Sequence, residues 1–126
     1  MIASLQLQDF RSYERASFEF DPGVSIIVGP NASGKTILLE AIQVVCHGES
    51  YRVRDIELLR FGAPLARLEA VSGEQRRVVA LERLEGVERV QKQFVINGQK
   101  LRRMLPRQRL PLVLFEPEHL RLIHAG

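Results

Sequence analysis

The sequence has no run of apolar residues long enough to cross a membrane. No stretch approaches the roughly 18 consecutive apolar residues that a transmembrane helix needs. The opening MIASLQLQDFRSYER also lacks the basic start and apolar core of a secretory signal. We therefore expect a cytoplasmic protein with no membrane partner.

Cysteine is almost absent, since Cys46 is the single thiol in the chain. One thiol cannot form an internal disulfide, and it has no partner at metal-ligand spacing. Its apolar neighbours Val44 and Val45 favour a small buried side chain. The three histidines show no metal-ligand pattern either, and we assign no role to His47, His119 and His124.

Low-complexity segments, long linkers and internal repeats are missing, and so is a strong charge of either sign. The 126 residues include 18 Lys and Arg against 15 Asp and Glu, a net charge of +3. This mild excess permits a nucleic-acid partner but does not demonstrate one. With 45% hydrophobic and 26% charged residues, the chain is an ordinary globular domain, or a piece of a larger one.

The first part of the sequence predicts three strands and a helix. Alternating apolar and polar residues predict strands over residues 3–10 and 15–20, joined by the tight connection RSYE. After the turn signal DPG, the apolar VSIIV predicts a buried strand over residues 24–28. Helical spacing then predicts a helix over residues 35–47, ending at Gly48, whose buried face is formed by Leu38, Ala41, Ile42 and Val45.

The rest of the sequence predicts an antiparallel sheet. A short helix is expected over residues 55–61, with Asp55 as its N-cap. From residue 66 the period changes to two in ARLEA, RRVVALERL and RVQKQFVI, and Asn97-Gly98 is a strong hairpin signal. LPLVLF at 110–115 predicts another buried strand. Pro117 suits the first turn of a helix carrying Leu120 and Ile123.

A phosphate-binding loop stands between the predicted buried strand and the helix. Gly29, four residues, Gly34, Lys35 and Thr36 match the P-loop pattern G-x-x-x-x-G-K-[ST]. Glycines let the backbone approach a phosphate, and the N–H groups from about Asn31 onward form an anion nest. Lys35 supplies a full positive charge, and the hydroxyl of Thr36 is placed to bind magnesium. The sequence therefore predicts a site for a nucleoside triphosphate with Mg²⁺.

Residues outside the bare pattern point to a particular family. The stretches LQLQDFRSYERASFEF and GVSIIVGPNASGKTILLEAIQVVCHGESYR resemble the start of the RecF family of bacterial recombination-repair ATPases, whose fold is similar to SMC-type and ABC-type ATPase heads. The resemblance continues through FVINGQKLRR to LPLVLFEPEHLRLIHAG, and so covers essentially the whole chain.

This resemblance implies an α/β fold: the N-terminal portion of a P-loop NTPase head of the ABC/SMC type, with an inserted antiparallel β-sheet. Residues 1–126 would be the N-terminal part of that head. Its strands, P-loop and first helix would occupy 1–48, and the sheet would occupy 66–115. The implied protein binds ATP with Mg²⁺, forms an ATP-dependent homodimer, and binds gapped DNA or single-stranded/double-stranded junctions without sequence preference. It helps to load the recombinase with RecR and RecO.

Carried over to this sequence, the resemblance implies a set of nucleotide-binding residues. The phosphates and magnesium would be held by Gly29, Pro30, Asn31, Ala32, Ser33, Gly34, Lys35 and Thr36. Arg11 and Ser12 resemble positions near the nucleotide, where a basic side chain reaches the phosphates or the base. An ordinary solvated turn arginine is the equal alternative for Arg11.

The machinery for hydrolysis is expected to be absent from these residues. LVLFEPE superficially copies a Walker B strand, but Glu116 stands where the usual aspartate belongs and no signature loop lies upstream. The resemblance implies that this segment is the strand before a P-E-D-L turn, and here His119 replaces the common acidic residue. Glu118 either points towards the nucleotide or is a helix-start carboxylate favoured by the dipole. We assign no catalytic residue and expect an incomplete head that does not hydrolyse ATP by itself.

Two groups of basic residues are candidates for a DNA-backbone track. The first group is Arg52, Arg54 and Arg60, and the second is Lys100, Arg102, Arg103, Arg107 and Arg109. A solvated arginine-rich surface is the alternative reading of both. Two other functions also stay open: a small P-loop metabolite kinase, and a catalytically inactive interaction module gated by nucleotide.

Overall fold

The chain folds around one six-stranded antiparallel sheet. The computed structural model describes residues 2–19, 24–25, 32–51, 53–110 and 123–124, with the backbone alone for 24–25, 32–36 and 123–124. The sheet order is β2-β1-β4-β5-β6-β7. Its strands are β1 (Ser4–Phe10), β2 (Tyr13–Glu19), β4 (Leu65–Ser72), β5 (Gln75–Arg83), β6 (Val90–Ile96) and β7 (Gln99–Leu101). The N-terminal hairpin and the later strands therefore form one continuous sheet, rather than a core with a separate sheet beside it.

Strand β1 joins these two parts of the sequence. It pairs with β2 through Leu7 and Ala16, and on its other side with β4 through Leu7 and Leu68. Leu5 and Leu7 are buried and Gln6 and Gln8 are exposed, as the period of two predicts, and Phe10 is buried at the end of the strand. β2 begins two residues before the predicted start, so the connection is a two-residue turn at Arg11 and Ser12.

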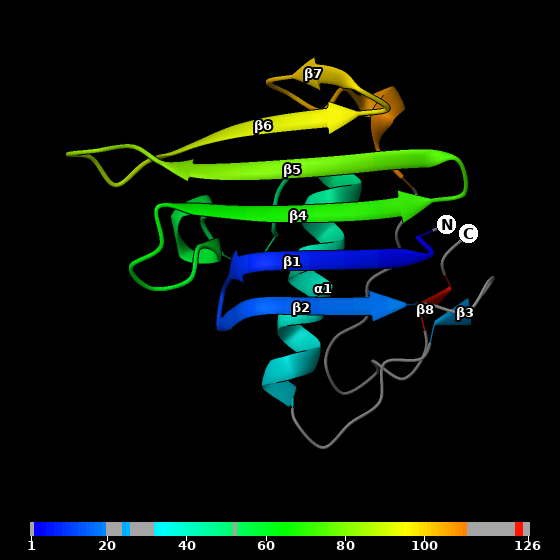
Figure 1. The fold of residues 1–126 in the computed structure, drawn as a ribbon, viewed down its shortest axis with the longest axis horizontal. Helices are drawn as coiled ribbons and strands as arrows, with labels where there is room; N and C mark the ends of the chain where they lie inside the picture. Colours follow the sequence, from blue (N-terminus) through cyan, green and yellow to red (C-terminus); the bar gives the residue numbers. More distant parts are fainter. Residues whose placement is uncertain (1, 20–23, 26–31, 52, 111–122, 125–126) are drawn as a thin grey trace.

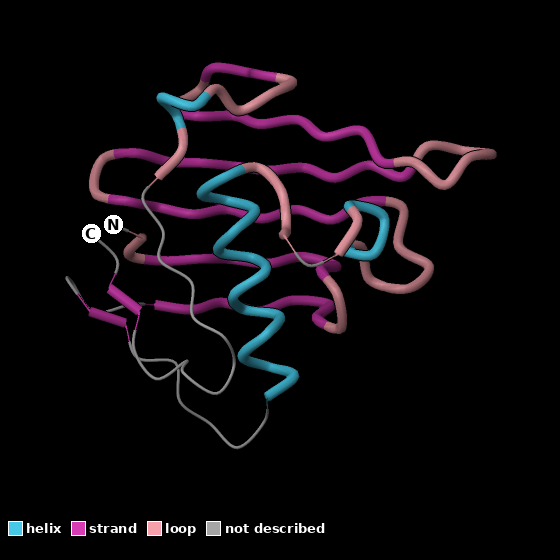
Figure 2. Tube along the Cα trace, turned by 180° about the vertical axis from the view of Figure 1, so that it is seen from behind, coloured by secondary structure: helices cyan, strands magenta, loops and turns pink. Residues whose placement is uncertain are grey.

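Among the described residues, helix α1 (Ala32–His47) covers one face of this sheet (Figure 1). The predicted residues Leu38, Ala41, Ile42 and Val45 are all buried in the core. Gly48 ends the helix with φ +90° and donates its N–H to the carbonyl of Val44 at 2.8 Å. Seen from behind, α1 crosses the strands, and its first turns extend past the β2 edge (Figure 2).

The hairpins of the sheet follow local turn chemistry. Asn97 and Gly98 adopt φ values of 50° and 84° in the two-residue loop between β6 and β7, which is the backbone that a type I′ hairpin requires. Ile96 and Gln99 pair directly across that loop. The prediction of a hairpin at this dipeptide is confirmed.

Two predicted helices need correction. The segment expected to be helical over 55–61 is a single 3₁₀ turn, η1 (Asp55–Leu58), and its N-cap is Arg54 rather than Asp55. It ends early because Leu59 forms a β-bridge with Phe10. Ile123 was expected in a helix but lies in the two-residue strand β8 (Ile123–His124), which pairs with β3 (Val24–Ser25). Of the strand predicted at 110–115, Leu110 is described and is in no strand, whereas residues 111–115, Pro117 and Leu120 lie outside the described residues.

Candidate nucleotide-binding site

The described helix begins inside the P-loop pattern. α1 starts at Ala32, three residues earlier than predicted, so the backbone from Ala32 to Thr36 forms its first turns. The first N–H groups of a helix have no partner within the helix and carry its positive partial charge, which suits a phosphate. Gly29, Pro30 and Asn31 lie outside the described residues, and the structure gives the backbone alone for Ala32, Ser33, Gly34, Lys35 and Thr36.

Arg11 is fixed against this helix. Its Nε lies 3.1 Å from Oε2 of Glu40, on α1, and its Nη1 donates a hydrogen bond to the carbonyl oxygen of Glu57 at 3.1 Å. The backbone N–H of Arg11 also donates to the carbonyl of Leu58 at 2.8 Å. Arg11 therefore joins the β1–β2 turn to both α1 and η1, and it is not an ordinary solvated turn residue.

The partner of Arg11 is an unusual residue for a core helix. The side chain of Glu40 is only 2% exposed, whereas that of Arg11 is 30% exposed. A buried carboxylate requires a charge partner or several hydrogen bonds, because transfer from water into the interior is otherwise costly. The ion pair thus fixes the position of the turn relative to the helix that leaves the P-loop.

Arg11 and Ser12 line a groove next to the first turns of α1. The groove has a volume of about 500 Å³ and includes Ile37, the residue that follows Thr36 in the P-loop pattern. Its lining is completed by Glu57, Leu59, Arg60 and Phe61. Phe61 is 98% exposed, so its aromatic ring is open to solvent beside this groove. The predicted residues Arg11 and Ser12 are therefore brought beside the helix that begins in the P-loop.

The first basic group that the sequence suggested is already engaged in ion pairs. Arg60 Nε lies 2.9 Å from Oδ1 of Asp9, and this hydrogen bond raises the pKa of Arg60. Arg54 pairs with Glu57 at 3.6 Å on the surface. Arg52 lies outside the described residues. The described members of this group are therefore occupied by acidic partners on the protein itself.

Arg77 is buried and stabilises the other end of α1. It is 2% exposed and donates hydrogen bonds to the carbonyl oxygens of Val45, at 3.1 Å, and of Gln108. Burial lowers the pKa of its guanidinium. A cation at the C-terminal end of a helix is favoured by the helix dipole. Arg77 thereby ties β5 to α1 and to the 3₁₀ turn η2 (Pro106–Gln108).

The roles of three of these residues were not predicted from the sequence. Glu40 stood within the family stretch LLEAI without an indicated partner, Arg77 read as one more basic strand residue, and Phe61 read as part of a helix. The alternation in RRVVALERL does place Arg77 on the same face as Val79 and Leu81. That alternation was the available signal for an inward-facing cation.

The described residues contain neither a cluster of metal-ligating His, Cys, Asp or Glu side chains nor a helix able to span a membrane. They contain no group of three His, Cys, Asp or Glu residues placed to hold a metal ion. Cys46 is buried as predicted, and burial raises the pKa of its thiol to about 11. In the same part of the chain, no helix combines the length and apolar character that crossing a bilayer requires.

Comparison with known proteins gives a family match over most of the chain. The sequence model of the AAA domain family matches residues 4–111. The chain belongs to the AAA domain family. This membership, with the sheet-and-helix fold, confirms the predicted P-loop NTPase fold with its antiparallel sheet.

Within that family the similarity is to RecF. The chain is 36% identical to the DNA replication and repair protein RecF of Lactobacillus johnsonii over 126 residues, which cover 99% of this chain and 33% of the relative. It is 39% identical to the RecF of Streptomyces avermitilis, over 97% of this chain and 33% of that protein. The chain therefore spans about a third of the length of the curated relatives it matches, and the resemblance to part of RecF is confirmed.

Solved RecF structures share the fold. The recombination mediator protein RecF-ATPrS of the RecFOR pathway matches with a TM-score of 0.65 and 27% identity, over 80% of this chain and 28% of that one. The corresponding RecF-ATP structure matches with a TM-score of 0.64 and the same identity, over 79% of this chain and 27% of that one. The RecF-like chain thus has the architecture of this part of RecF.

Proposed function

We propose that this chain is the ATP-binding portion of a RecF-like DNA repair and recombination ATPase. The observation that carries the proposal is the start of α1 within the complete P-loop pattern, beside a groove that is lined by Arg11, which pairs with Glu40 on α1. A helix start of this kind binds phosphate, and the groove provides room next to it for the rest of a nucleotide. A relative solved as RecF-ATP supports ATP as the ligand.

Each site residue then has a role. Gly29 through Thr36 hold the phosphates. Lys35 contributes a positive charge that stabilises the outer phosphates, and Thr36 binds Mg²⁺. Ser12 and the aromatic face of Phe61 border the space for the base. Arg11 positions the turn through Glu40. No residue is assigned to catalysis, and residues 1–126 form the N-terminal part of an ABC/SMC-like head that binds ATP without hydrolysing it alone.

The wider activity is proposed from the relatives. They are DNA replication and repair proteins, and the solved one belongs to the RecFOR pathway. On that basis the whole protein is a cytoplasmic one that dimerises around ATP, binds gapped or junction DNA without sequence preference, and acts with RecR and RecO in recombinase loading.

Thermal unfolding with and without Mg-ATP tests the nucleotide proposal. A ligand at about 100 times its Kd stabilises the native state by about 2.7 kcal/mol, so Mg-ATP should raise the melting temperature clearly. Lys35→Ala should remove most of that increase, because it removes the charge on the outer phosphates. Lys100→Ala removes an equal charge from exposed β7 and should keep the increase. Equal responses of the two variants would refute the assignment.

Turnover assays separate the alternative functions. The purified chain should show no appreciable Mg²⁺-dependent hydrolysis of ATP, and no transfer of phosphate to small metabolites. Hydrolysis that Lys35→Ala abolishes would show that the chain is a complete ATPase. Transfer that depends on an added metabolite would instead establish the kinase. A chain that binds ATP with neither activity, and shows no affinity for DNA, would fit the inactive nucleotide-gated module.

A further inference from the structure

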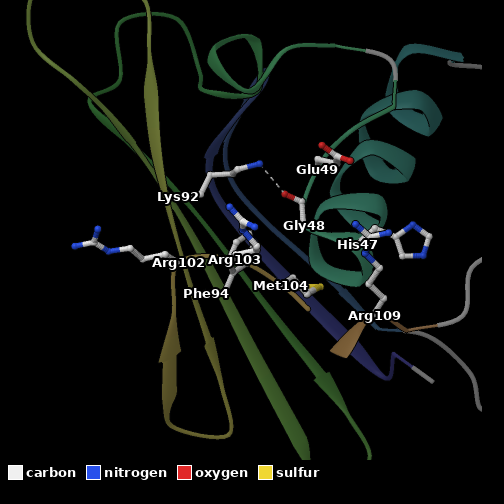
Figure 3. A pocket seen from close by; sticks show the side chains of 9 residues that line it. All are labelled: His47, Gly48, Glu49, Lys92, Phe94, Arg102, Arg103, Met104 and Arg109. Atoms are coloured by element: carbon white, nitrogen blue, oxygen red, sulfur yellow. Dashed lines mark hydrogen bonds between the residues drawn. The ribbon is translucent and has the colours of Figure 1, made fainter. Parts of the chain in front are cut away.

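A second cavity, which we call the basic cavity, lies at the far end of α1 from the P-loop. Its volume is about 210 Å³ (Figure 3). The lining comes from the end of α1, from β6, and from the segment after β7. It consists of His47, Gly48, Glu49, Lys92, Phe94, Arg102, Arg103, Met104 and Arg109. α1 has 16 residues and rises about 1.5 Å per residue, so its two ends are on the order of 24 Å apart.

Lys92 forms a fixed wall of the basic cavity. Its Nζ lies 3.0 Å from Oδ2 of Asp55 and donates to the carbonyl oxygen of Gly48 at 3.1 Å, the contact drawn in Figure 3. Gly48 itself is closely packed, since a Cβ there would lie 3.3 Å from the ring of Phe94. The loop after α1 is therefore hydrogen-bonded to β6 through Lys92 and packs closely against Phe94.

The arginines at the mouth of the cavity are not held in this way. Arg102, Arg103 and Arg109 are exposed, and within the described part of the chain their guanidinium groups have no ion pair or hydrogen bond. Figure 3 shows Arg103 extending towards the Gly48 loop and Arg109 towards His47, whereas Arg102 points away. Glu49 is the one carboxylate in the lining. Positive charge therefore exceeds negative charge here.

The surroundings favour a nucleic-acid backbone over a protein partner. Residues 99–110 contain five basic and no acidic residues, and a guanidinium fork matches the geometry of a phosphate. Protein interfaces usually have an apolar centre. The exposed large hydrophobic residues of the described chain, Tyr51, Phe61, Leu65 and Val87, are all absent from the lining of the basic cavity.

We infer that the basic cavity is a contact site for DNA-backbone phosphate, with Arg103 and Arg109 as its ligands and Arg102 extending the contact along the strand. This inference rests on the proposed association with DNA and assigns residues to it. The site is separate from the nucleotide site, because Figures 1 and 2 place the start of α1 at the β2 edge, whereas the basic cavity adjoins β6 and the segment after β7.

The test is fluorescence anisotropy of a labelled gapped duplex, titrated with the full chain across a salt series. Arg103→Ala/Arg109→Ala should weaken binding by about tenfold and lower the salt slope by about 1.4–1.8, since each phosphate contact contributes about 0.7–0.9. The matched control is Arg15→Ala/Arg89→Ala. It removes the same charge from β2 and from the β5–β6 hairpin, where neither side chain has an ion pair or hydrogen bond to the described residues. This control variant should bind like the unmodified chain.

Four outcomes would overturn the inference. They are an unmodified chain that does not bind the duplex, equal losses in the two double variants, an unchanged salt slope, and equal competition by poly-glutamate of matched charge. The last result would assign the cavity to an acidic protein. The melting-temperature increase with Mg-ATP, measured on the same preparations, tests the nucleotide site independently, and both double variants should retain it.

Discussion

Replacement of Arg11 by alanine is predicted to destabilise the chain much more than loss of an exposed ion pair. In the native fold, Arg11 lies 3.1 Å from the buried carboxylate of Glu40 and also donates to the Glu57 carbonyl. The substitution removes both contacts and leaves Glu40 buried in α1 without its Arg11 cation. The β1–β2 turn also loses its side-chain link to the helix that leaves the P-loop.

The expected size follows from burial. Removing one partner of a buried ion pair costs about 3–5 kcal/mol. The Arg11 side chain is 30% exposed, so water reaches the site in the variant and the lower end applies, about 3 kcal/mol. About 1 kcal/mol corresponds to a few degrees in a chain of this size. The melting temperature should therefore fall by roughly 10 °C.

Urea unfolding of a double-mutant cycle measures this effect. Glu40→Gln removes the buried charge, so Arg11→Ala/Glu40→Gln should be more stable than the sum of the single changes predicts, by about 1 kcal/mol or more. Arg54→Ala is the control, because its pair with Glu57 is exposed and should contribute at most about 0.5 kcal/mol. If Arg11→Ala costs no more than Arg54→Ala and shows no coupling to Glu40, Arg11 does not position the turn.

Three further predictions concern the end of α1. Cys46 should react with a thiol reagent at pH 8 at least 100-fold more slowly in the native chain than in urea, because burial raises its pKa from 9.0 to about 11 and each pKa unit is tenfold in thiolate. Equal rates would contradict its burial. Because the native thiol binds its proton more tightly, its contribution to stability should also be lost between pH 9.0 and about 11. Gly48→Ala should destabilise the fold by about 1 kcal/mol more than Gly98→Ala. Both glycines have a positive φ, but only at Gly48 would an added Cβ press on Phe94. Equal urea midpoints for the two variants would refute this difference.

Local patterns in the sequence predicted the elements well. The period of two located β1, β4, β5 and β6, helical spacing gave the buried face of α1, and Asn97-Gly98 gave its hairpin, because each of these depends on neighbouring residues alone. The P-loop fold was predicted from the pattern G-x-x-x-x-G-K-[ST], whose residues are also close neighbours in the sequence.

Pairings between residues that are far apart in the sequence could not be predicted from these local patterns. The position of β1 between β2 and β4 depends on contacts more than 50 residues apart, and no local period encodes them. The same holds for Arg11 and Glu40: the sequence shows both residues but not that one meets the other. Ile123 was assigned to a helix for this reason too, since its partner Ser25 is distant in the chain.

The central claim is that the P-loop at the start of α1 holds a nucleotide, and calorimetric titration with Mg-ATP tests it most directly. The chain should bind one ATP per molecule, and Lys35→Ala should lose most of the affinity while Lys100→Ala keeps it. Binding that is unchanged in Lys35→Ala, or no binding by the unmodified chain, would contradict the claim.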